Sequence, residues 1–361
     1  MIGIVLLFYW DYRGLKITPD NNPFQHIAKT DCANLPHQDV HIVYITDENY
    51  IYPTQVSAYS AIKNKCPQST YYFHIIVDGV NPHKAAQAFN PLASETVHFN
   101  IVPQKRAVDI DFSDYLKHIS ASALLKFIIP TALPNVDRAI FLDSDTLVTK
   151  DLQTLFTTEL GDNLAGAVAD IGITTQHAYL ENLGYKEDVY YNAGVLLLDL
   201  AKMRQYNIPQ QLNTYVQNNR HLVFWDQDAY NIILKKHIKT LPYIYNCAPI
   251  LHLNDNPLPN FWHYFTKRIK RRKPSISPFM NLYASELPFF YRNTFKDVAI
   301  FHYFGVAKPW KEEEGTIKSI ELYFNLWRQY AQDMQQQKHL SPRPISPIAI
   351  KRSKNHSTNT Q

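Results

Sequence analysis

The stretch that decides the fold is AIFLDSDTLVTKDL, residues 139–152. Its apolar start predicts a buried strand that ends at two carboxylates, Asp143 and Asp145, with one residue between them. Because residues i and i+2 of a strand share a face, we expect both carboxylates to point the same way. Two close acids repel each other unless a cation lies between them, and oxygen ligands favour Mn²⁺ or Mg²⁺ over zinc. The stretch therefore predicts a divalent metal site that also takes substrate phosphates.

An isolated D-x-D triplet is also common in solvated turns, which is the alternative reading of this pattern. Here the triplet ends a core strand instead of a polar loop. Ligands of α/β proteins bind outside the carboxyl ends of strands, so the position favours the metal site.

Apolar runs with strand character alternate with helix-like runs around this stretch, which is typical of an α/β protein with a parallel sheet. No G-x-G-x-x-G and no G-x-x-x-x-G-K-S/T motif occurs, so a bound nucleotide would be held by carboxylates and metal instead of a glycine-rich cradle. Strands are expected at 41–46, 71–77, 97–102, 138–142 and 191–200, and helices at 53–64, 82–89, 120–129 (ended by Pro130) and from 224–231 onward.

The composition is that of a globular protein. The chain has 361 residues, 45% hydrophobic and 13% aromatic, which is ample for a packed core. A formal net charge of +4 is mild and does not indicate a nucleic-acid partner. The cysteines, Cys32, Cys66 and Cys247, are odd in number and widely spaced, so neither a disulfide framework nor a zinc site is expected. A reducing cytoplasm is the simplest location for such a chain.

The two ends of the chain differ from its middle. Residues 1–10, MIGIVLLFYW, are too short to span a bilayer and lack the basic start of a signal peptide, so we expect a strand there. We divide the chain into a leader (1–40), the main domain (41–310), a helix (311–334) and a disordered basic tail (335–361).

A basic aromatic segment, residues 261–273 (FWHYFTKRIKRRK), lies within the main domain. A solvated basic face is one reading of it, and attraction to an anionic membrane surface is the other. The second reading predicts a peripheral protein on the inner face of the cytoplasmic membrane. No recognition motif supports nucleic-acid binding by these cations.

Three more segments carry polar residues next to apolar runs. Each has a structural alternative: Asn192 and Gly194 of YNAGVLLLDL could form a turn before a core strand, and one acid of FWDQDAYN could cap a helix. His302 of IFHYFGVAKPW could be a structural histidine at the end of an apolar strand.

Five segments occur together in order: ITDENY, LLKFIIP, FLDSD, YNAGVLLLDL with FWDQDAYN, and HYFGVAKPW. Over residues 41–310 the chain thereby resembles glycosyltransferase family 8, and especially its bacterial lipopolysaccharide galactosyl- and glucosyltransferases. The resemblance implies a GT-A fold, which is a Rossmann-like, mixed and mostly parallel sheet flanked by helices. It also implies that Mn²⁺, or else Mg²⁺, holds a UDP-sugar.

The resemblance also implies roles for individual residues. Asp143, Asp145 and His302 match the metal ligands. Lys126 stands where the family commonly has an arginine, which replaces a bidentate fork by a point charge in the donor site. Asp47, Asn49 and Tyr50, with the backbone of Ser144, match the residues that bind the uridine. Gly305 and Lys308 match positions at the diphosphate. The matches around the donor sugar are Asn192, Asp226 and Gln227, together with Asp228.

Members of the family retain the anomeric configuration, and a double displacement would need a carboxylate nucleophile. We expect Gln227 to stabilise a front-face transition state instead, with Asp228 or Asp226 as a covalent nucleophile in second place. The resulting hypothesis is a retaining, metal-dependent transfer of galactose or glucose from a UDP-hexose to a lipid-linked glycan such as a lipooligosaccharide. The alternatives are a metal-dependent phosphohydrolase and a non-catalytic protein that binds nucleotide sugars or glycans.

Overall fold

A computed structural model describes Phe24 and residues 27–104, 121–174, 176–187, 189–219, 222–248, 295–305, 307–311 and 318–340. The strand expected at residues 1–10, the basic aromatic segment 261–273 and the tail from 341 onward lie outside these residues.

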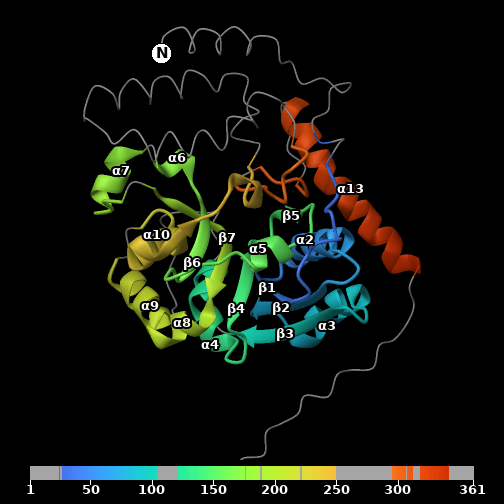
Figure 1. Cartoon of the computed structure of the whole chain (residues 1–361), viewed down its shortest axis with the longest axis horizontal. Helices are drawn as coiled ribbons and strands as arrows, with labels where there is room; N and C mark the ends of the chain where they lie inside the picture. The colour runs from blue at the N-terminus through green and yellow to red at the C-terminus, as the bar shows by residue number, and fades with distance from the viewer. Residues whose placement is uncertain are drawn as a thin grey trace, which may run out of the picture.

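A seven-stranded sheet forms the centre of the molecule, with the strand order β3-β2-β1-β4-β7-β6-β8 (Figure 1). Strand β7 runs antiparallel to its neighbours β4 and β6, and every other pair in this sheet is parallel. This mixed, mostly parallel sheet confirms the expected architecture. The strands are β1 (Asp39–Thr46), β2 (Thr70–Asp78), β3 (Val97–Gln104), β4 (Arg138–Leu142), β6 (Ala165–Ala169), β7 (Tyr191–Asp199) and β8 (Ile238–Thr240).

Helices cover both faces of the sheet, and the side chains of β1 alternate between two cores. Val40, Ile42 and Tyr44 are buried in a core shared with α2 and α3, whereas Val43 and Ile45 are buried in a core shared with α8, α9 and α10. Burial on both faces explains the nearly continuous apolar run of β1. The helices are α2 (Ile51–Asn64), α3 (Pro82–Phe89), η2 (Asn90–Leu92), η3 (Ala121–Ile128), α4 (Ile129–Ala132), α5 (Gln153–Phe156), α6 (Ile171–Thr174), α7 (His177–Asn182), α8 (Leu200–Gln205), α9 (Ile208–Asn218), α10 (Trp225–Leu234), η4 (Lys235–His237) and η5 (Tyr243–Tyr245).

The segment before β4 differs from the helix expected at 120–129. It is the 3-10 helix η3, and Pro130 does not end it but lies in the first turn of α4. Proline is tolerated there because the first backbone N–H groups of a helix have no partner within the helix.

A two-stranded sheet joins the middle of the chain to its later part. Strand β5 (Thr146–Val148) pairs antiparallel with β9 (Ile300–His302), so that Thr146 lies opposite His302. His302 is the last residue of β9, so it lies at the end of an apolar strand, as the sequence predicted. This pairing brings residues from distant parts of the chain to one edge of the molecule.

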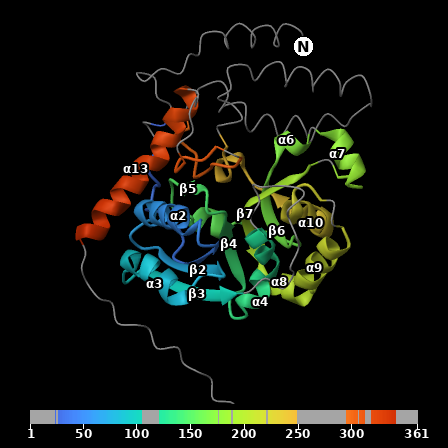
Figure 2. The same ribbon diagram turned by 180° about the vertical axis from the view of Figure 1, so that it is seen from behind.

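Helix α13 (Lys318–Leu340) packs against α2 through its second half (Figures 1 and 2). It ends later than the expected 311–334, because Ala331 and Met334 continue its buried face and Gln335 bonds to Tyr52 beyond them. The first residues of the expected disordered tail are therefore helical.

The described part of the expected leader lies against the main domain. Phe24 stacks on Phe295 with ring centroids 5.0 Å apart, and the Ala28 N–H donates to the Lys296 carbonyl at 2.9 Å. The Asp151 N–H donates to Thr30 Oγ1 at 2.8 Å.

The cysteines correct an expectation from the sequence. Cys32 and Cys66 form a disulfide, with Cα atoms 5.6 Å apart and a separation of 34 positions in the sequence, while Cys247 is a buried free thiol. The spacing hid the pair because only the packing of residues 27–38 beside the end of α2 brings the two together. Disulfides persist in oxidising compartments, so the cysteines no longer support a reducing cytoplasm. None of the helices in the described ranges is long and apolar enough to cross a membrane.

Candidate active site

The acid pair lies in a turn and not on a strand face, which corrects the expected geometry. Strand β4 ends at Leu142, and the turn before β5 is closed by the Thr146 N–H and Oγ1, which donate to the Asp143 carbonyl at 3.1 and 2.8 Å. Ser144 points inward, where its Oγ donates to the Ile45 carbonyl at 3.1 Å and accepts from Thr54 Oγ1 at 2.8 Å. The buried Ser144 anchors the turn.

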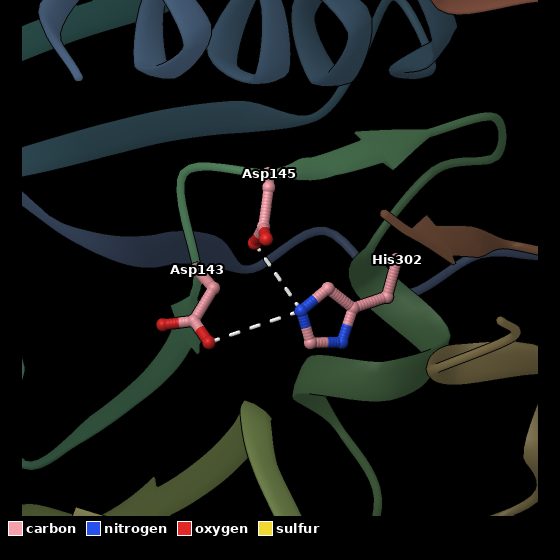
Figure 3. Close-up of side chains that lie close together, drawn as sticks. All are labelled: Asp143, Asp145 and His302. Atoms are coloured by element: carbon pink, nitrogen blue, oxygen red, sulfur yellow. Dashed lines mark ion pairs between the residues drawn. The ribbon is translucent and has the colours of Figure 1, made fainter. Parts of the chain in front are cut away.

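The turn and the end of β9 bring the three predicted metal ligands together (Figure 3). His302 Nε2 lies 3.2 Å from Asp145 Oδ1 and 3.9 Å from Asp143 Oδ2. One ligand atom from each residue lies within 4.8 Å of the others, a spread that suits a single ion. Two carboxylates and an imidazole are a donor set that Mn²⁺ accepts readily.

The beginning of β7 forms the wall of this cluster. The Asp143 N–H donates to the Gly194 carbonyl at 2.8 Å, so the backbones of the turn and β7 are in direct contact. A Cβ at Gly194 would overlap the ring of His302 and lie 2.9 Å from Asp143 Oδ2. Glycine is required here because the ligands occupy the space of a side chain.

Two buried lysines flank the acid pair. Lys308 Nζ lies 2.5 Å from Asp145 Oδ2 and donates to the Tyr303 carbonyl at 2.8 Å. Lys126 Nζ lies 3.1 Å from Asp143 Oδ1 and 2.6 Å from Asp226 Oδ2. One carboxylate oxygen of each acid therefore contacts a lysine, and the other oxygen faces His302.

The electrostatics of the two acids differ. Burial alone would raise the pKa of Asp145, but Lys308 and His302 outweigh it and hold this pKa well below its usual range. Burial raises the pKa of Asp143, an effect that Lys126 opposes but does not cancel. Burial also tends to lower the pKa of Lys126, and its two carboxylate neighbours reverse this, so Lys126 stays charged.

The predicted uridine loop lies at the same edge of the sheet, because β1 and β4 are parallel and end there. Asp47 Oδ1 accepts from the N–H groups of Asn49 and Tyr50 at 2.9 and 3.2 Å, which shapes the loop. The ring of Tyr50 meets the ring of Trp310 edge to face, with centroids 6.0 Å apart. Gly305 has a φ of +95°, which favours glycine.

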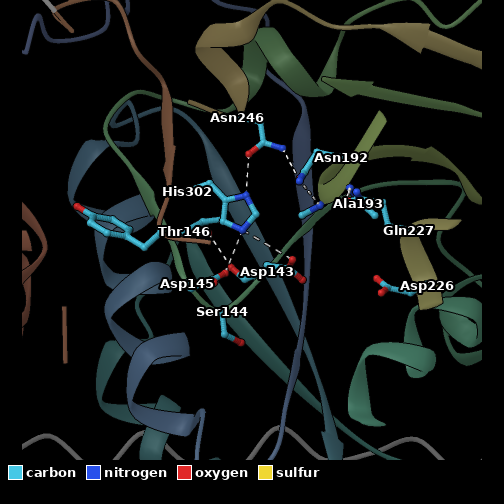
Figure 4. A network of polar contacts seen from close by, with 12 residues as sticks. Asp143, Ser144, Asp145, Thr146, Asn192, Ala193, Asp226, Gln227, Asn246 and His302 are labelled. Carbon is cyan, nitrogen blue, oxygen red and sulfur yellow. Dashed lines mark hydrogen bonds and ion pairs between the residues drawn. The ribbon is translucent and has the colours of Figure 1, made fainter. Parts of the chain in front are cut away.

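The acids and the amide at the start of α10 separate into two environments. Asp226 pairs with Lys126, and Gln227 Oε1 accepts from the Ala193 N–H at 3.0 Å, so both lie beside the cluster of Asp143, Asp145 and His302 (Figure 4). Asp228 is fully buried elsewhere, where it accepts from the Tyr190 hydroxyl at 2.6 Å. The Tyr179 hydroxyl (2.7 and 2.8 Å) and the Phe224 N–H (2.9 Å) also donate to this carboxylate.

Sequence reasoning missed two polar residues of this site, Asp170 and Asn246. Asp170 follows β6, whose carboxyl end lies at the same edge, and its Oδ2 accepts from Gln227 Nε2 at 3.2 Å. An acid directly after a buried strand was a signal for it, as at Asp143. Asn246 Oδ1 lies 2.8 Å from His302 Nδ1, and no local pattern marks this residue.

A mixed α/β sheet with an Asp-x-Asp turn and a histidine at its carboxyl edge is the architecture of a GT-A glycosyltransferase. The chain belongs to glycosyl transferase family 8, whose family model matches residues 41–314.

Known proteins similar to this chain agree with that membership. A Haemophilus influenzae protein described as a glycosyltransferase is 26% identical over 214 residues, which are 59% of this chain and 64% of the relative. The chain thus spans less than two thirds of that relative's length. A lipopolysaccharide 1,2-glucosyltransferase of Escherichia coli is 25% identical over 281 residues, 74% of this chain and 71% of the relative. The structure of galactosyltransferase LgtC with donor and acceptor sugar analogs has a TM-score of 0.62 at 23% identity, covering 81% of this chain and 96% of that one. This last likeness shows the shared fold.

Proposed function

We propose that this glycosyltransferase is metal-dependent and retaining, and that it moves galactose or glucose from a UDP-sugar to a lipooligosaccharide or a related glycan. The observation that carries the metal dependence is the clustering of Asp143, Asp145 and His302 within 4.8 Å. Family membership supports the transfer of a sugar, and the similarity to a lipopolysaccharide glucosyltransferase supports the class of acceptor.

The charges of the site fit the departure of a nucleoside diphosphate. A divalent ion held by Asp143, Asp145 and His302, Mn²⁺ or else Mg²⁺, would stabilise the negative charge that develops on the leaving UDP. Lys308 adds a buried positive charge beside Asp145, and Gly305 allows a close approach of the backbone. Asp47, Asn49 and Tyr50, with the backbone of Ser144, would receive the uridine at the adjoining strand end.

The reacting centre is proposed to lie beside Gln227, with Asn192 and Asp226 around the donor sugar. Asp228 is a poor nucleophile here, because two tyrosine hydroxyls and a backbone N–H already occupy its oxygens. Asp226 is held by Lys126 at 2.6 Å. We therefore favour front-face substitution, in which the acceptor hydroxyl attacks from the side that UDP leaves and Gln227 stabilises positive charge on the sugar.

The acceptor is proposed to be lipid-linked and reached at the surface of the cytoplasmic membrane, and the inner face of that membrane was the side expected from the sequence. The support for a membrane surface is the charge of residues 261–273, which lie outside the described residues. The Cys32–Cys66 disulfide argues against a reducing location. Thiol alkylation of freshly lysed cells decides this point. If Cys32 and Cys66 react with the alkylating agent only after reduction, the disulfide exists in the cell and a cytoplasmic location is overturned.

The proposed function is tested by incubating the purified protein with Mn²⁺ and a panel of UDP-sugars, without acceptor, and measuring UDP release. We expect slow release with one hexose donor that EDTA abolishes. Release of inorganic phosphate instead would favour a phosphohydrolase. Donor binding without release, when lipooligosaccharide is also supplied, would favour a non-catalytic binding protein.

A further inference from the structure

A chain of hydrogen-bonded polar side chains connects His302 to Gln227, and Figure 4 shows its first part, from His302 through Asn246 to Asn192. His302 Nδ1 lies 2.8 Å from Asn246 Oδ1, and Asn246 Nδ2 donates to Asn192 Oδ1 at 2.8 Å. Asn192 Nδ2 then donates to Asp170 Oδ2 at 3.3 Å. Gln227 Nε2 donates to the same oxygen at 3.2 Å, which completes the connection.

A backbone group fixes the direction of the first part of this chain. The Gly194 N–H donates to Asn192 Oδ1 at 2.9 Å, so this atom must be the amide oxygen. Its second partner, on Asn246, must then be an amide nitrogen, which leaves Asn246 Oδ1 to face His302. An oxygen there accepts from a protonated Nδ1, so the neutral form of the ring carries its proton on Nδ1, and Nε2 is the nitrogen that can offer a lone pair to a cation beside the two carboxylates.

A second backbone group fixes the other end. The Ala193 N–H donates to Gln227 Oε1 at 3.0 Å, so the Gln227 nitrogen must face Asp170. Asp170 has only acceptor oxygens when ionised, and its Oδ1 already accepts from the Ile173 N–H at 3.0 Å. The N–H groups of Ala193 and Gly194, which are consecutive in β7, therefore set the orientations of the Gln227 and Asn192 amides.

The backbone also holds Asn246 opposite His302. The Cys247 N–H donates to the Ile300 carbonyl at 2.9 Å, and the His302 N–H donates to the Cys247 carbonyl at 2.8 Å. Asn246 is 5% exposed and His302 is 3% exposed, so bulk water does not compete for their hydrogen bond. Removing the Asn246 oxygen would leave the buried Nδ1 without this acceptor.

We propose that Asn246 and Asn192 are positioning residues: they hold His302 in the tautomer that offers Nε2 to a divalent cation, and they tie that tautomer to the orientation of Gln227. This inference rests on the proposed function in one respect, since it takes Asp143, Asp145 and His302 as the cation site. Partners of this kind that lie behind a metal-ligating histidine change metal affinity by about 10- to 100-fold.

The test compares Asn246→Leu with Asn246→Asp by titrating each protein with Mn²⁺ and counting free ions by electron paramagnetic resonance, without nucleotide. Leucine removes the acceptor for Nδ1, so we expect the affinity to fall by about 10- to 100-fold. Aspartate keeps an acceptor, so we expect an affinity within about threefold of the wild type. A purely space-filling role predicts the reverse order, because leucine keeps the volume and aspartate adds a buried charge.

Asn64→Leu is the matched control. The Asn64 amide donates to the carbonyls of Ser60 and Val148 at 2.9 and 3.0 Å, away from the cluster, so its loss should lower the melting temperature and leave Mn²⁺ affinity unchanged. Equal Mn²⁺ binding by Asn246→Leu and the wild type would overturn the positioning role, as would equal losses in both Asn246 variants. A wild type that binds Mn²⁺ but releases no UDP would overturn the proposed function alone. A wild type that binds no Mn²⁺ would overturn both.

Discussion

In the part of the chain that the structure describes, two triplets have D-x-D spacing, 143–145 and 226–228, and the structure uses them differently. The first lies in the turn between β4 and β5, where both acids face His302. The second lies in the first turn of α10, where residues two apart point about 200° away from each other around the helix. Asp226 therefore faces Lys126 and the cluster, while Asp228 faces the protein interior.

The hydrogen-bond and ion-pair partners of the two triplets indicate a functional role for the first triplet and a structural role for Asp228 of the second. In the first triplet, lysines pair with the outer oxygens, and the inner oxygens face His302. At Asp228, by contrast, hydroxyl and N–H donors take up the carboxylate completely. The comparison teaches that D-x-D spacing predicts a metal site only when the backbone conformation makes the two acids converge.

The largest effect is expected from Asp145→Ala. The change removes a ligand oxygen and the partner of Lys308, so Mn²⁺ binding should fall below detection. UDP release should fall about 1000-fold or more, since a lost metal is worth several kcal/mol in the transition state. Both quantities are measured beside the wild type, and unchanged Mn²⁺ affinity in a folded variant would refute the assignment of the first triplet.

Asp228→Ala should act on stability instead. Two tyrosine hydroxyls and the Phe224 N–H lose their acceptor in the interior, which should lower the free energy of unfolding by about 3 kcal/mol. Urea unfolding measures this loss, and Mn²⁺ affinity should stay within about twofold of the wild type when measured well below the transition. If Asp228→Ala keeps the wild-type free energy of unfolding but no longer binds Mn²⁺, Asp228 is a metal ligand and the assignment of the two triplets is wrong.

Gly194→Ala tests the convergence of the first triplet without changing a ligand. The added Cβ collides with His302 and Asp143, so we expect Mn²⁺ affinity to fall by about tenfold or more, or about 1.4 kcal/mol. The control is Gly172→Ala, whose Cβ would meet Asp170 Oδ1 at an ordinary 3.4 Å. Equal affinities of the two variants would show that the cluster has more room than the structure gives it.

The smallest effect concerns pH in the metal-free protein. Burial raises the pKa of Asp228 above its ordinary value of 3.8, so ionisation of this group disfavours folding. The wild type should therefore gain stability relative to Asp228→Asn as the pH falls from 7 towards 4. The pKa of Asp145 is lowered instead, so the stability it contributes is lost only below pH 3.8, and the gap to Asp145→Asn should stay flat over the same range.

Urea unfolding of the three proteins at several pH values, in EDTA, checks this contrast. If the wild type instead loses free energy of unfolding relative to Asp228→Asn as the pH falls, the tyrosine hydroxyls outweigh burial in setting the pKa of Asp228.

Local patterns in the sequence predicted much of the fold and part of the site. Alternating strands and helices were found because each strand is a separate apolar run, and the five segments predicted that Asp143, Asp145 and His302 lie together because the order of the segments is specific. Periodicity could not show that Asp143 and Asp145 lie in a turn, since a strand and a turn after it read alike. Grouping Asp228 with Gln227 took neighbours in sequence as neighbours in space, which a helix does not allow.

Other features depend on contacts between distant parts of the chain. Asn246 reaches His302 through the pairing of Cys247 with β9, and Cys32 reaches Cys66 because the segment before β1 packs beside α2. Neither pair leaves a periodic or compositional signal. Asp170 is different, because an acid at the carboxyl end of a buried strand could have been found by the reasoning that found Asp143.

The most direct test of the metal site is anomalous diffraction at the manganese edge from crystals soaked with MnCl₂ and UDP. The account predicts one strong peak among Asp143, Asp145 and His302, about 2.0–2.6 Å from a carboxylate oxygen of each acid and near Nε2. No peak at these residues, or a peak at Asp226 and Asp228 instead, would contradict it.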